Sequence, residues 1–599
     1  MPMKLHYAIR PAHAGAHLFH VTVTIDRPSA EGQLFMLPAW IPGSYMIREF
    51  ARNIVQVAAL AGEERVPVEK LDKHTWRVPA LGDFDGPLTL AYEVYAWDLS
   101  VRAALLDTTL GFFNATSVFL LPLGWEDARI EVDILPPAGD HAAGWRVATG
   151  LAPARGTKRH AFGTYTARDY DELIDCPVLM GEFALARFDV LGTPHEIAIA
   201  GRVPDLDLER LGADLARLCA EQIELFEPAT RRAPFERYTF LTLAVGEGYG
   251  GLEHRNSTAL ICKRDDLPYR GMAETTEGYR RFLGLASHEY FHAWNVKRIR
   301  PAAFVPYSLE RENYTRLLWL FEGFTSYYDD LLLLRAGLIT TSQYLGLLAK
   351  NFNDVLSASG RRKQSLAESS FDAWIKYYRQ DENSPNAIVS YYQKGALIAL
   401  SLDLAIRARS GGKRSLDDLM RLLWARHAEA ADDYAGVHEE EIGELITEAT
   451  DLVLDEELAA WTEGTADPDF AALLAPFGIR FTARPQRESA ARALLGLKLA
   501  PGIEPRVAQV YDRGAAQAAG LSAGDVLVAL DGLRVTPASL DPLLHRRRPG
   551  QHAEVLAFRR DELLRFDVTL TDSAPPHIEL QPEEKPGGAA RKLRKGWLP

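Results

Sequence analysis

Ser287-His288-Glu289-Tyr290-Phe291-His292-Ala293-Trp294-Asn295 is the stretch around which the rest of the chain is interpreted. His288 and His292 are four residues apart, so a helix with about 3.6 residues per turn places both imidazoles on one face. Neutral imidazole is a good zinc ligand, and a catalytic zinc site has three protein ligands and one position open to water. Glu289 follows the first histidine, where its carboxylate can reach that water rather than the metal. The pattern H-E-x-x-H therefore predicts two metal ligands and one catalytic carboxylate.

The surroundings of this motif favour a buried helix. The run from Tyr279 to Trp294 is rich in apolar residues, and buried histidine and glutamate side chains are costly unless a partner such as a metal ion compensates. The chain has 16 histidines, so for the pentapeptide taken alone the alternative is an amphipathic helix with two solvated histidines. The apolar context favours the metal site.

A third ligand is predicted in the next apolar segment. Leu317 to Tyr328 reads as a helical run with a single acid, Glu322, at its centre. A carboxylate in such surroundings is rare unless it is paired or bound to a metal. Glu322 is therefore the predicted third ligand, with an ion pair to Arg316 or Lys297 as the alternative.

Taken together, these motifs resemble the gluzincin metallopeptidases, in which two histidines and a downstream glutamate hold zinc. Gly250-Gly251-Leu252-Glu253-His254 resembles the exopeptidase strand whose glutamate binds the free amino group of the substrate. Tyr391-Tyr392-Gln393-Lys394-Gly395 resembles the segment whose tyrosine, here Tyr392, stabilises the tetrahedral intermediate. On sequence alone, a tyrosine at position 392 is more often a packing residue.

The chain departs in two ways from the alanyl aminopeptidase and leukotriene hydrolase pattern. The interval from His292 to Glu322 is longer, with an insertion around residues 300–314, and His254 stands where that family has asparagine. With a C-terminal PDZ-like segment, these departures are similar to the glycyl aminopeptidase family, number sixty-one among the metallopeptidases. The resemblance implies one zinc ion per chain, peptide substrates with a free N-terminus, and removal of N-terminal glycine or alanine.

Length predicts several domains, because 599 residues exceed what one core can organise. The patterns and the resemblance together predict a multidomain α+β fold. The expected parts are an N-terminal antiparallel β-sandwich over 1–185, a thermolysin-like zinc catalytic domain over 186–340, an α-helical domain over 341–485, a PDZ-like domain over 486–573 and a mobile tail over 574–599.

Alternating apolar and polar residues predict strands in the first part, as at Phe19, Val21, Val23 and Ile25. Two aromatic loops, Trp40-Ile41-Pro42-Gly43-Ser44-Tyr45 and Gly111 to Thr116, are interpreted as turns and packing without an assigned role, with a position reaching toward the active-site cleft as the alternative.

The second part is predicted to hold a helix at Leu208 to Phe226 and strands at Tyr238 to Val245 and Leu252 to Ile261. Gly250 and Gly251 are predicted to lie in a turn along bound substrate, because glycine permits close backbone approach and a peptide can extend a sheet edge. A plain hairpin turn is the alternative.

The C-terminal region predicts helices at 392–407, 415–427 and 439–452, followed by a compact β-rich module. Leu494 to Leu499 is interpreted as a carboxylate-binding loop and strand, and Gly514 to Gly520 as a short helix. A PDZ-like groove would receive a peptide C-terminus on exposed backbone N–H groups. The last 26 residues, rich in proline, glycine and charge, are expected to be mobile.

Composition narrows the partners and the compartment. The formal charge of −14 argues against nucleic acid or an anionic membrane as a partner. Cys176, Cys219 and Cys262 lack a disulfide or ligand spacing and are expected to be buried as small apolar residues. No signal peptide or membrane-spanning segment is evident, so a cytoplasmic location is expected.

Three other functions compete with an aminopeptidase. An endopeptidase would use the same zinc site but not Glu253, and a hydrolase of a small non-peptide substrate could use the same scaffold. A non-catalytic PDZ scaffold is the third, disfavoured because both histidines, Glu289 and Glu322 are present.

Overall fold

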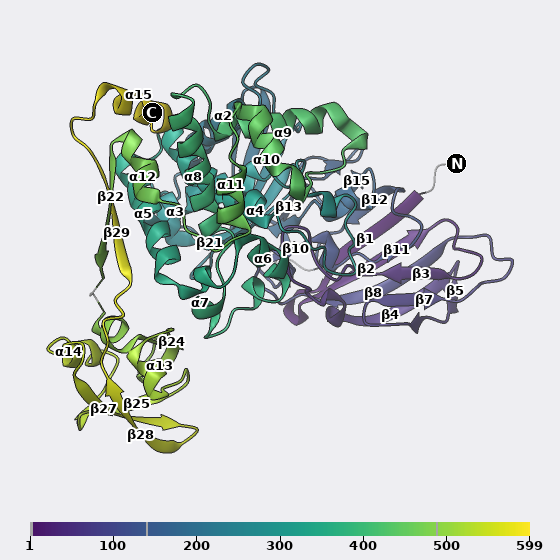
Figure 1. Cartoon of the computed structure of the whole chain (residues 1–599). Coiled ribbons are helices and arrows are strands. Elements are labelled where there is room, and N and C mark those ends of the chain that lie inside the picture. Colours follow the sequence, from purple (N-terminus) through teal and green to yellow (C-terminus); the bar gives the residue numbers. More distant parts are fainter. Residues whose placement is uncertain (1–3, 139–141, 487–488) are drawn as a thin grey trace. The chain divides into compact units, whose positions relative to one another are not determined.

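The computed structural model describes residues 4–138, 142–486 and 489–599 (Figure 1). It confirms a multidomain α+β protein with a β-rich N-terminal part and a helical part. The chain forms two compact units, and helix α4 (Leu318–Arg335) contributes residues to both. The first unit comprises Met1–Asn313, Tyr328–Ile339 and Leu423–Val437, and the second comprises Tyr314–Tyr327, Thr340–Leu422 and His438–Pro599.

The N-terminal part is built from an eight-stranded sheet, β14-β15-β12-β1-β2-β8-β4-β5, and two four-stranded sheets, β13-β16-β10-β9 and β11-β3-β7-β6. Alternation at Phe19, Val21, Val23 and Ile25 is confirmed, since all four side chains are fully buried. The strands are β1 (Lys4–His13), β2 (Leu18–Ile25), β3 (Gln33–Met36), β4 (Ile54–Ala61), β5 (Glu64–Val66), β6 (Glu69–Lys70), β7 (Thr75–Val78), β8 (Leu88–Tyr95), β9 (Ala104–Leu106), β10 (Leu110–Phe113), β11 (Leu121–Pro122), β12 (Arg129–Ile134), β13 (Arg146–Thr149), β14 (Ala152–Pro153), β15 (Gly163–Ala167) and β16 (Val178–Gly181).

This arrangement corrects the expected antiparallel sandwich, because β1 and β12 pair in parallel, with Lys4 opposite Arg129. A parallel pair needs a long crossover connection, and more than one hundred residues separate these two strands. Local alternation predicts each strand but not the direction of a partner so distant in sequence.

The other sheet of the first unit has the order β17-β18-β19-β21-β20 and shares one hydrophobic core with the N-terminal sheets. The predicted helix and strand are confirmed as α2 (Leu208–Phe226) and β19 (Tyr238–Val245). The remaining elements are β17 (Phe183–Val190), β18 (Thr193–Ala200), β20 (Gly250–Glu253), β21 (Ser257–Lys263), α1 (Tyr170–Ile174) and α3 (Glu277–Phe291).

The predicted strand from Leu252 to Ile261 is wrong in one respect, because a hairpin interrupts it. The chain turns between Glu253 and Ser257, and the His254 N–H donates to the Ser257 carbonyl at 3.0 Å. Gly250 and Gly251 lie within edge strand β20 rather than in the preceding turn. Apolar residues on both sides of the hairpin conceal the break in the sequence pattern.

The second unit contains most of the predicted helical region, although α9 continues into the first unit from Leu423 onward. The three clearest helical predictions are confirmed as α8, α9 and α10. The helices are α5 (Thr341–Ser357), α6 (Leu366–Phe371), α7 (Ser384–Ala387), α8 (Gln393–Arg409), α9 (Leu416–Ala430), α10 (Ile442–Thr450), α11 (Asp455–Thr462) and α12 (Phe470–Leu474). No helix in the described ranges is long and apolar enough to cross a lipid bilayer.

The mobile tail expected at 574–599 is wrong. Strand β29 (Pro576–Pro582) pairs antiparallel with β22 (Ile479–Pro485), and helix α15 (Gly588–Trp597) follows. Trp597 is fully buried, and its ring lies 5.6 Å from that of Phe477. The average composition of residues 574–599 is polar, so the sequence pattern did not indicate that one aromatic residue, Trp597, packs this segment against the rest of the unit.

The compact module between β22 and β29 has its own hydrophobic core. The predicted short helix at 514–520 is confirmed as α13. The expected loop at Leu494 is not open, because Ala491–Leu495 forms a π-helical turn in which the Gly496 N–H bonds to the Ala491 carbonyl. The module's elements are β23 (Leu497–Leu499), β24 (Val507–Val510), α13 (Ala515–Ala519), β25 (Val526–Leu530), β26 (Leu533–Arg534), α14 (Leu540–Leu544), β27 (His552–Arg559) and β28 (Glu562–Thr569).

Deleting this module is expected to leave the rest of the chain folded. Its ends meet on the paired strands β22 and β29 (Figure 1), and Pro485 lies opposite Pro576 in their register. A short glycine-containing turn can therefore replace residues 486–575 without separating β22 from β29. Thermal denaturation followed by circular dichroism should show the main transition shifted by only a few degrees. Loss of the cooperative transition would show instead that the module is required for folding.

Candidate metal and substrate site

The helix that carries the histidine motif begins with a clear cap and keeps its geometry to the end. Thr276 accepts a hydrogen bond from the Tyr279 N–H at 3.1 Å, which starts α3. His292 follows the last helical residue but retains helical backbone angles, φ −61° and ψ −18°. The one-turn spacing is therefore maintained, and the Nε2 atoms of His288 and His292 face each other at 3.0 Å.

The other nitrogen of each ring is fixed by an acceptor. The Nδ1 atom of His288 lies 3.1 Å from Asp329 Oδ2, and that of His292 lies 2.7 Å from the Asn295 carbonyl. Nδ1–H donation to these oxygens makes each Nε2 the unprotonated nitrogen of its ring, the form in which imidazole binds a metal. A hydrogen-bond acceptor on the second ring nitrogen is typical of metal-bound histidines.

Glu322 is the third candidate ligand and lies on α4, the helix that also carries Asp329. Asp329 is seven positions after Glu322, so both project from the same face about two turns apart. One ligand atom each from His288, His292 and Glu322 lies within 4.8 Å of the others. The structure thus brings the predicted metal set together, and Glu322 is only 2% exposed.

These residues fit a zinc ion. Two Zn–N bonds of about 2.0–2.1 Å at a tetrahedral angle require nitrogens about 3.3 Å apart, close to the 3.0 Å between His288 and His292. Two imidazoles and one carboxylate are also a donor set of catalytic zinc. A bound cation would offset the cost of burying the Glu322 carboxylate beside the two imidazoles.

A second group of candidate ligands shares His292 with the first. Ligand atoms of Glu253, Glu289 and His292 also lie within 4.8 Å of one another, and both carboxylates are at least 95% buried. Among the described residues, Glu253 Oε1 has no hydrogen-bond partner. Two carboxylates so close repel each other, which favours a cation between or beside them.

Gly251 creates the space for the catalytic carboxylate. Residues 251 and 253 lie on the same face of β20 because side chains alternate along a strand. A Cβ built on Gly251 would lie 2.2 Å from Glu289 Oε1. The predicted contact of Gly250 and Gly251 with substrate stays a prediction, whereas the contact of Gly251 with Glu289 is a role that the sequence did not reveal.

Replacing Gly251 by alanine is therefore expected to displace Glu289 and lower kcat at least about ten-fold. Gly246→Ala is the matched control, since its Cβ would meet only the flexible end of Arg264 at 3.5 Å. Steady-state kinetics of the two variants, with zinc content measured beside them, checks this. Equal kcat values for the two variants would contradict it.

The aromatic loop at Trp40 to Tyr45 has a place in this site, contrary to the interpretation as mere packing. Gly43 has a φ of +95°, and a Cβ there would lie 2.5 Å from either carboxylate oxygen of Glu253. Trp40, Gly43, Tyr45 and Glu253 line a small cavity of about 30 Å³. The Pro-Gly turn between aromatic residues was the available sequence signal.

Tyr392 immediately precedes α8, at its N-cap position. Its hydroxyl lies 3.2 Å from that of Tyr378, and its ring stacks on Tyr391 with centroids 4.6 Å apart. Burial raises the pKa of Tyr391, and the nearby charge of Glu322 adds to the rise. Within the second unit, the tyrosine cluster and the predicted ligand Glu322 are therefore neighbours.

Comparisons with known proteins agree with this geometry. Residues 6–182 match the family described as "Peptidase M61 N-terminal domain", and residues 281–398 match "M61 glycyl aminopeptidase". An aminopeptidase N family protein from Idiomarina loihiensis is 40% identical, with a TM-score of 0.91 over 99% of this chain and 100% of that chain. The fold and the site define a metallopeptidase. The chain belongs to the M61 peptidase family.

More distant solved structures share less. An M1 zinc metallopeptidase from Deinococcus radiodurans is 15% identical, with a TM-score of 0.47 over 78% of this chain and 94% of that chain. Yeast LTA4 hydrolase in complex with bestatin is 12% identical, with a TM-score of 0.47 over 80% of this chain and 70% of that chain. None of the curated proteins matches the chain.

Proposed function

We propose that this chain is a zinc-dependent aminopeptidase of the gluzincin type that removes small N-terminal residues, glycine and alanine, from peptides. The observation that carries the proposal is the convergence of His288, His292 and Glu322 beside the buried carboxylates of Glu253 and Glu289. One zinc ion per chain would be held by the two Nε2 atoms and the Glu322 carboxylate. When bound there, zinc supplies Lewis-acid activation of water and of the scissile carbonyl.

The two remaining carboxylates take different roles. Glu253 binds the α-ammonium of the substrate, because its oxygen Oε1 is buried without a partner and a cation offsets its charge. Glu289 accepts the proton of the attacking water and passes it to the leaving amine. The short separation between the two carboxylates supports these roles, because an ammonium bound at Glu253 would bring the substrate's first residue beside Glu289.

Tyr392 is proposed to donate its hydroxyl hydrogen to the developing oxyanion. The family resemblance of the Tyr-x-Lys-Gly segment motivates this role, and the neighbourhood of Glu322 and Tyr391 supports it. The hydrogen bond with Tyr378 and the stack on Tyr391 hold the phenol in a defined orientation.

The preference for small residues is supported by the cavity at Glu253. Its volume of about 30 Å³ and the close approach of Gly43 leave little room for a bulky side chain. The same cavity is walled by aromatic residues of the N-terminal part, which do not yield easily to a larger substrate.

The module at 486–573 is proposed to be PDZ-like, with a peptide C-terminus as its ligand class. Strand β23, helices α13 and α14 and the closing hairpin β27–β28 support this assignment. Because the Gly496 N–H is engaged with Ala491, ligand binding there would require the π-helical turn to open.

Metal analysis combined with a pair of substrates tests the proposed function. The purified protein should contain one zinc per chain and release p-nitroaniline from Gly-p-nitroanilide but not from its N-acetylated form. Equal rates on both would identify an endopeptidase-like specificity, and activity only on non-peptide esters or epoxides would identify a small-molecule hydrolase. A protein that binds no stoichiometric zinc would overturn the proposal.

A further inference from the structure

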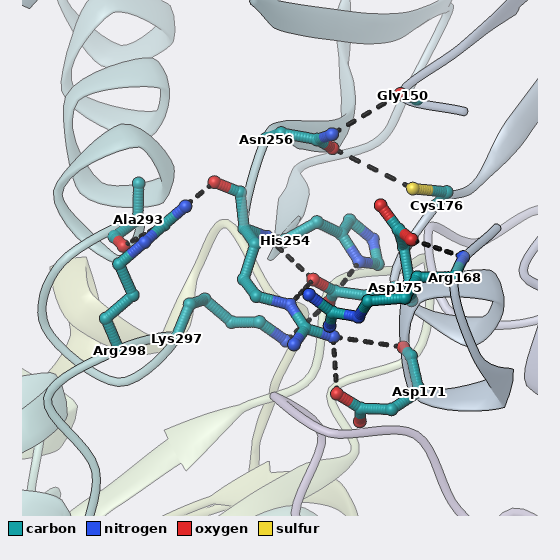
Figure 2. A network of polar contacts seen from close by, with 12 residues as sticks. Gly150, Arg168, Asp171, Asp175, Cys176, His254, Asn256, Ala293, Lys297 and Arg298 are labelled. Atoms are coloured by element: carbon teal, nitrogen blue, oxygen red, sulfur yellow. Dashed lines mark hydrogen bonds and ion pairs between the residues drawn. The ribbon is translucent and has the colours of Figure 1, made fainter. Parts of the chain in front are cut away.

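The hairpin that follows Glu253 forms hydrogen bonds and ion pairs with residues outside its own sheet (Figure 2). His254, Arg255 and Asn256 form its tip, between β20 and β21. Asp175, which follows helix α1 of the N-terminal part, contacts the first two of these residues. The tip of this hairpin determines where the strand carrying Glu253 ends.

Asp175 is a fully engaged buried carboxylate. Its Oδ2 accepts hydrogen bonds from the Arg255 backbone N–H at 2.9 Å and from the Arg255 Nε at 2.8 Å. Its Oδ1 lies 2.6 Å from Lys297 Nζ and 3.2 Å from His254 Nδ1. Burial alone would raise the pKa of Asp175, but Lys297 and Arg255 together hold it well below its usual range.

Lys297 connects this carboxylate to the metal-binding helix. The Lys297 backbone N–H donates to the His292 carbonyl at 3.1 Å, and Arg298 Nη1 donates to the Arg255 carbonyl at 3.0 Å. The segment that follows His292 and the hairpin that follows Glu253 therefore meet at one carboxylate, as Figure 2 shows.

The third residue of the hairpin tip is held independently. Asn256 donates from Nδ2 to the Gly150 carbonyl at 3.3 Å, and its Oδ1 lies 3.8 Å from the Cys176 sulfur. All three tip residues thus contact the N-terminal part within the first unit. The N-terminal part, which supplies none of the three predicted metal ligands, therefore holds the hairpin that carries Glu253.

We propose that Asp175 is a positioning residue that fixes Glu253 relative to His292, and so sets where the substrate's ammonium lies relative to the scissile carbonyl. This inference rests on the proposed aminopeptidase function. Asp175 contacts neither substrate nor metal in this scheme. It acts through the two residues that follow Glu253 and through Lys297.

The test is the variant Asp175→Asn with a matched control. Asparagine keeps the shape of the side chain but removes the charge that holds Lys297 and Arg255. We expect the KM for Gly-p-nitroanilide to rise about ten-fold or more, with kcat within about three-fold and zinc content unchanged. A merely structural role would lower thermal stability without this selective change in KM.

Glu196→Gln is the control because Glu196 is also a buried carboxylate within the first unit that pairs with residues of the N-terminal part. It contacts Arg159 and lies 3.1 Å from His160 Nε2, and neither residue adjoins Glu253. We expect this variant to lose thermal stability to a similar degree while its KM stays at the wild-type value. An equal rise in KM for both variants would overturn the proposal.

Lys297→Gln covers the case in which Asp175→Asn fails to fold. It removes the ion pair but leaves the hydrogen bonds of Asp175 to the hairpin, so we expect a smaller rise in KM with zinc retained. An unchanged KM in the folded variants, with wild-type hydrolysis intact, would refute only the positioning role. An inactive wild-type protein would refute the proposed function itself.

Discussion

Glu289→Gln is expected to lower kcat on Gly-p-nitroanilide by about 10²- to 10⁴-fold while the protein keeps its zinc. Glutamine has the same shape, so the packing around residue 289 is preserved, but it cannot accept the proton of the attacking water. Glu289 lies beside His292 without being one of the three predicted ligands, which is why metal content should not change. Steady-state kinetics and metal analysis on the same preparation check both parts.

Glu277→Gln is the control on the same helix, because Glu277 is exposed in the first turn of α3. Its kcat should equal that of the wild type. If Glu289→Gln loses zinc in proportion to activity, residue 289 is a ligand rather than a proton acceptor, and the assignment of the three ligands must be revised.

Much of this site was predictable because its residues are related by local periodicity. His288 and His292 need only one helical turn to meet, and Glu322 is recognisable as the single acid in an apolar run. The same holds for α2 and β19, whose residue patterns extend over many positions. The spacing of apolar residues along the chain predicts these helices and strands, and the cost of burying a charged side chain identifies the candidate ligands.

The remaining features depend on contacts between residues far apart in sequence. Gly43 lies against Glu253 and Asp175 contacts Lys297, although more than one hundred residues separate the members of each pair. No period in the sequence relates such positions. The packing of Trp597 was missed for a different reason, since one aromatic side chain anchors a segment whose average composition is polar.

The Glu253→Gln variant is expected to lose activity toward free amino termini while gaining stability. The substrate's ammonium would lose a charge-assisted hydrogen bond in a buried site, which is typically worth about 1.5–3 kcal/mol, or roughly 10- to 150-fold in kcat/KM. The neutral amide also removes the repulsion between two buried carboxylates, those of Glu253 and Glu289. The melting temperature of the metal-free protein should therefore rise rather than fall.

A fall in activity together with a rise in melting temperature would show that Glu253→Gln loses substrate recognition, because misfolding would lower both. Kinetics on Gly-p-nitroanilide and on its N-acetylated form, together with thermal denaturation after chelation of the metal, provide the measurements. The acetylated substrate has no ammonium to bind, so its slow background rate should not fall in the variant. A variant that cleaves both substrates like the wild type would show that Glu253 does not bind the amino terminus, and the exopeptidase assignment would then lose its structural basis.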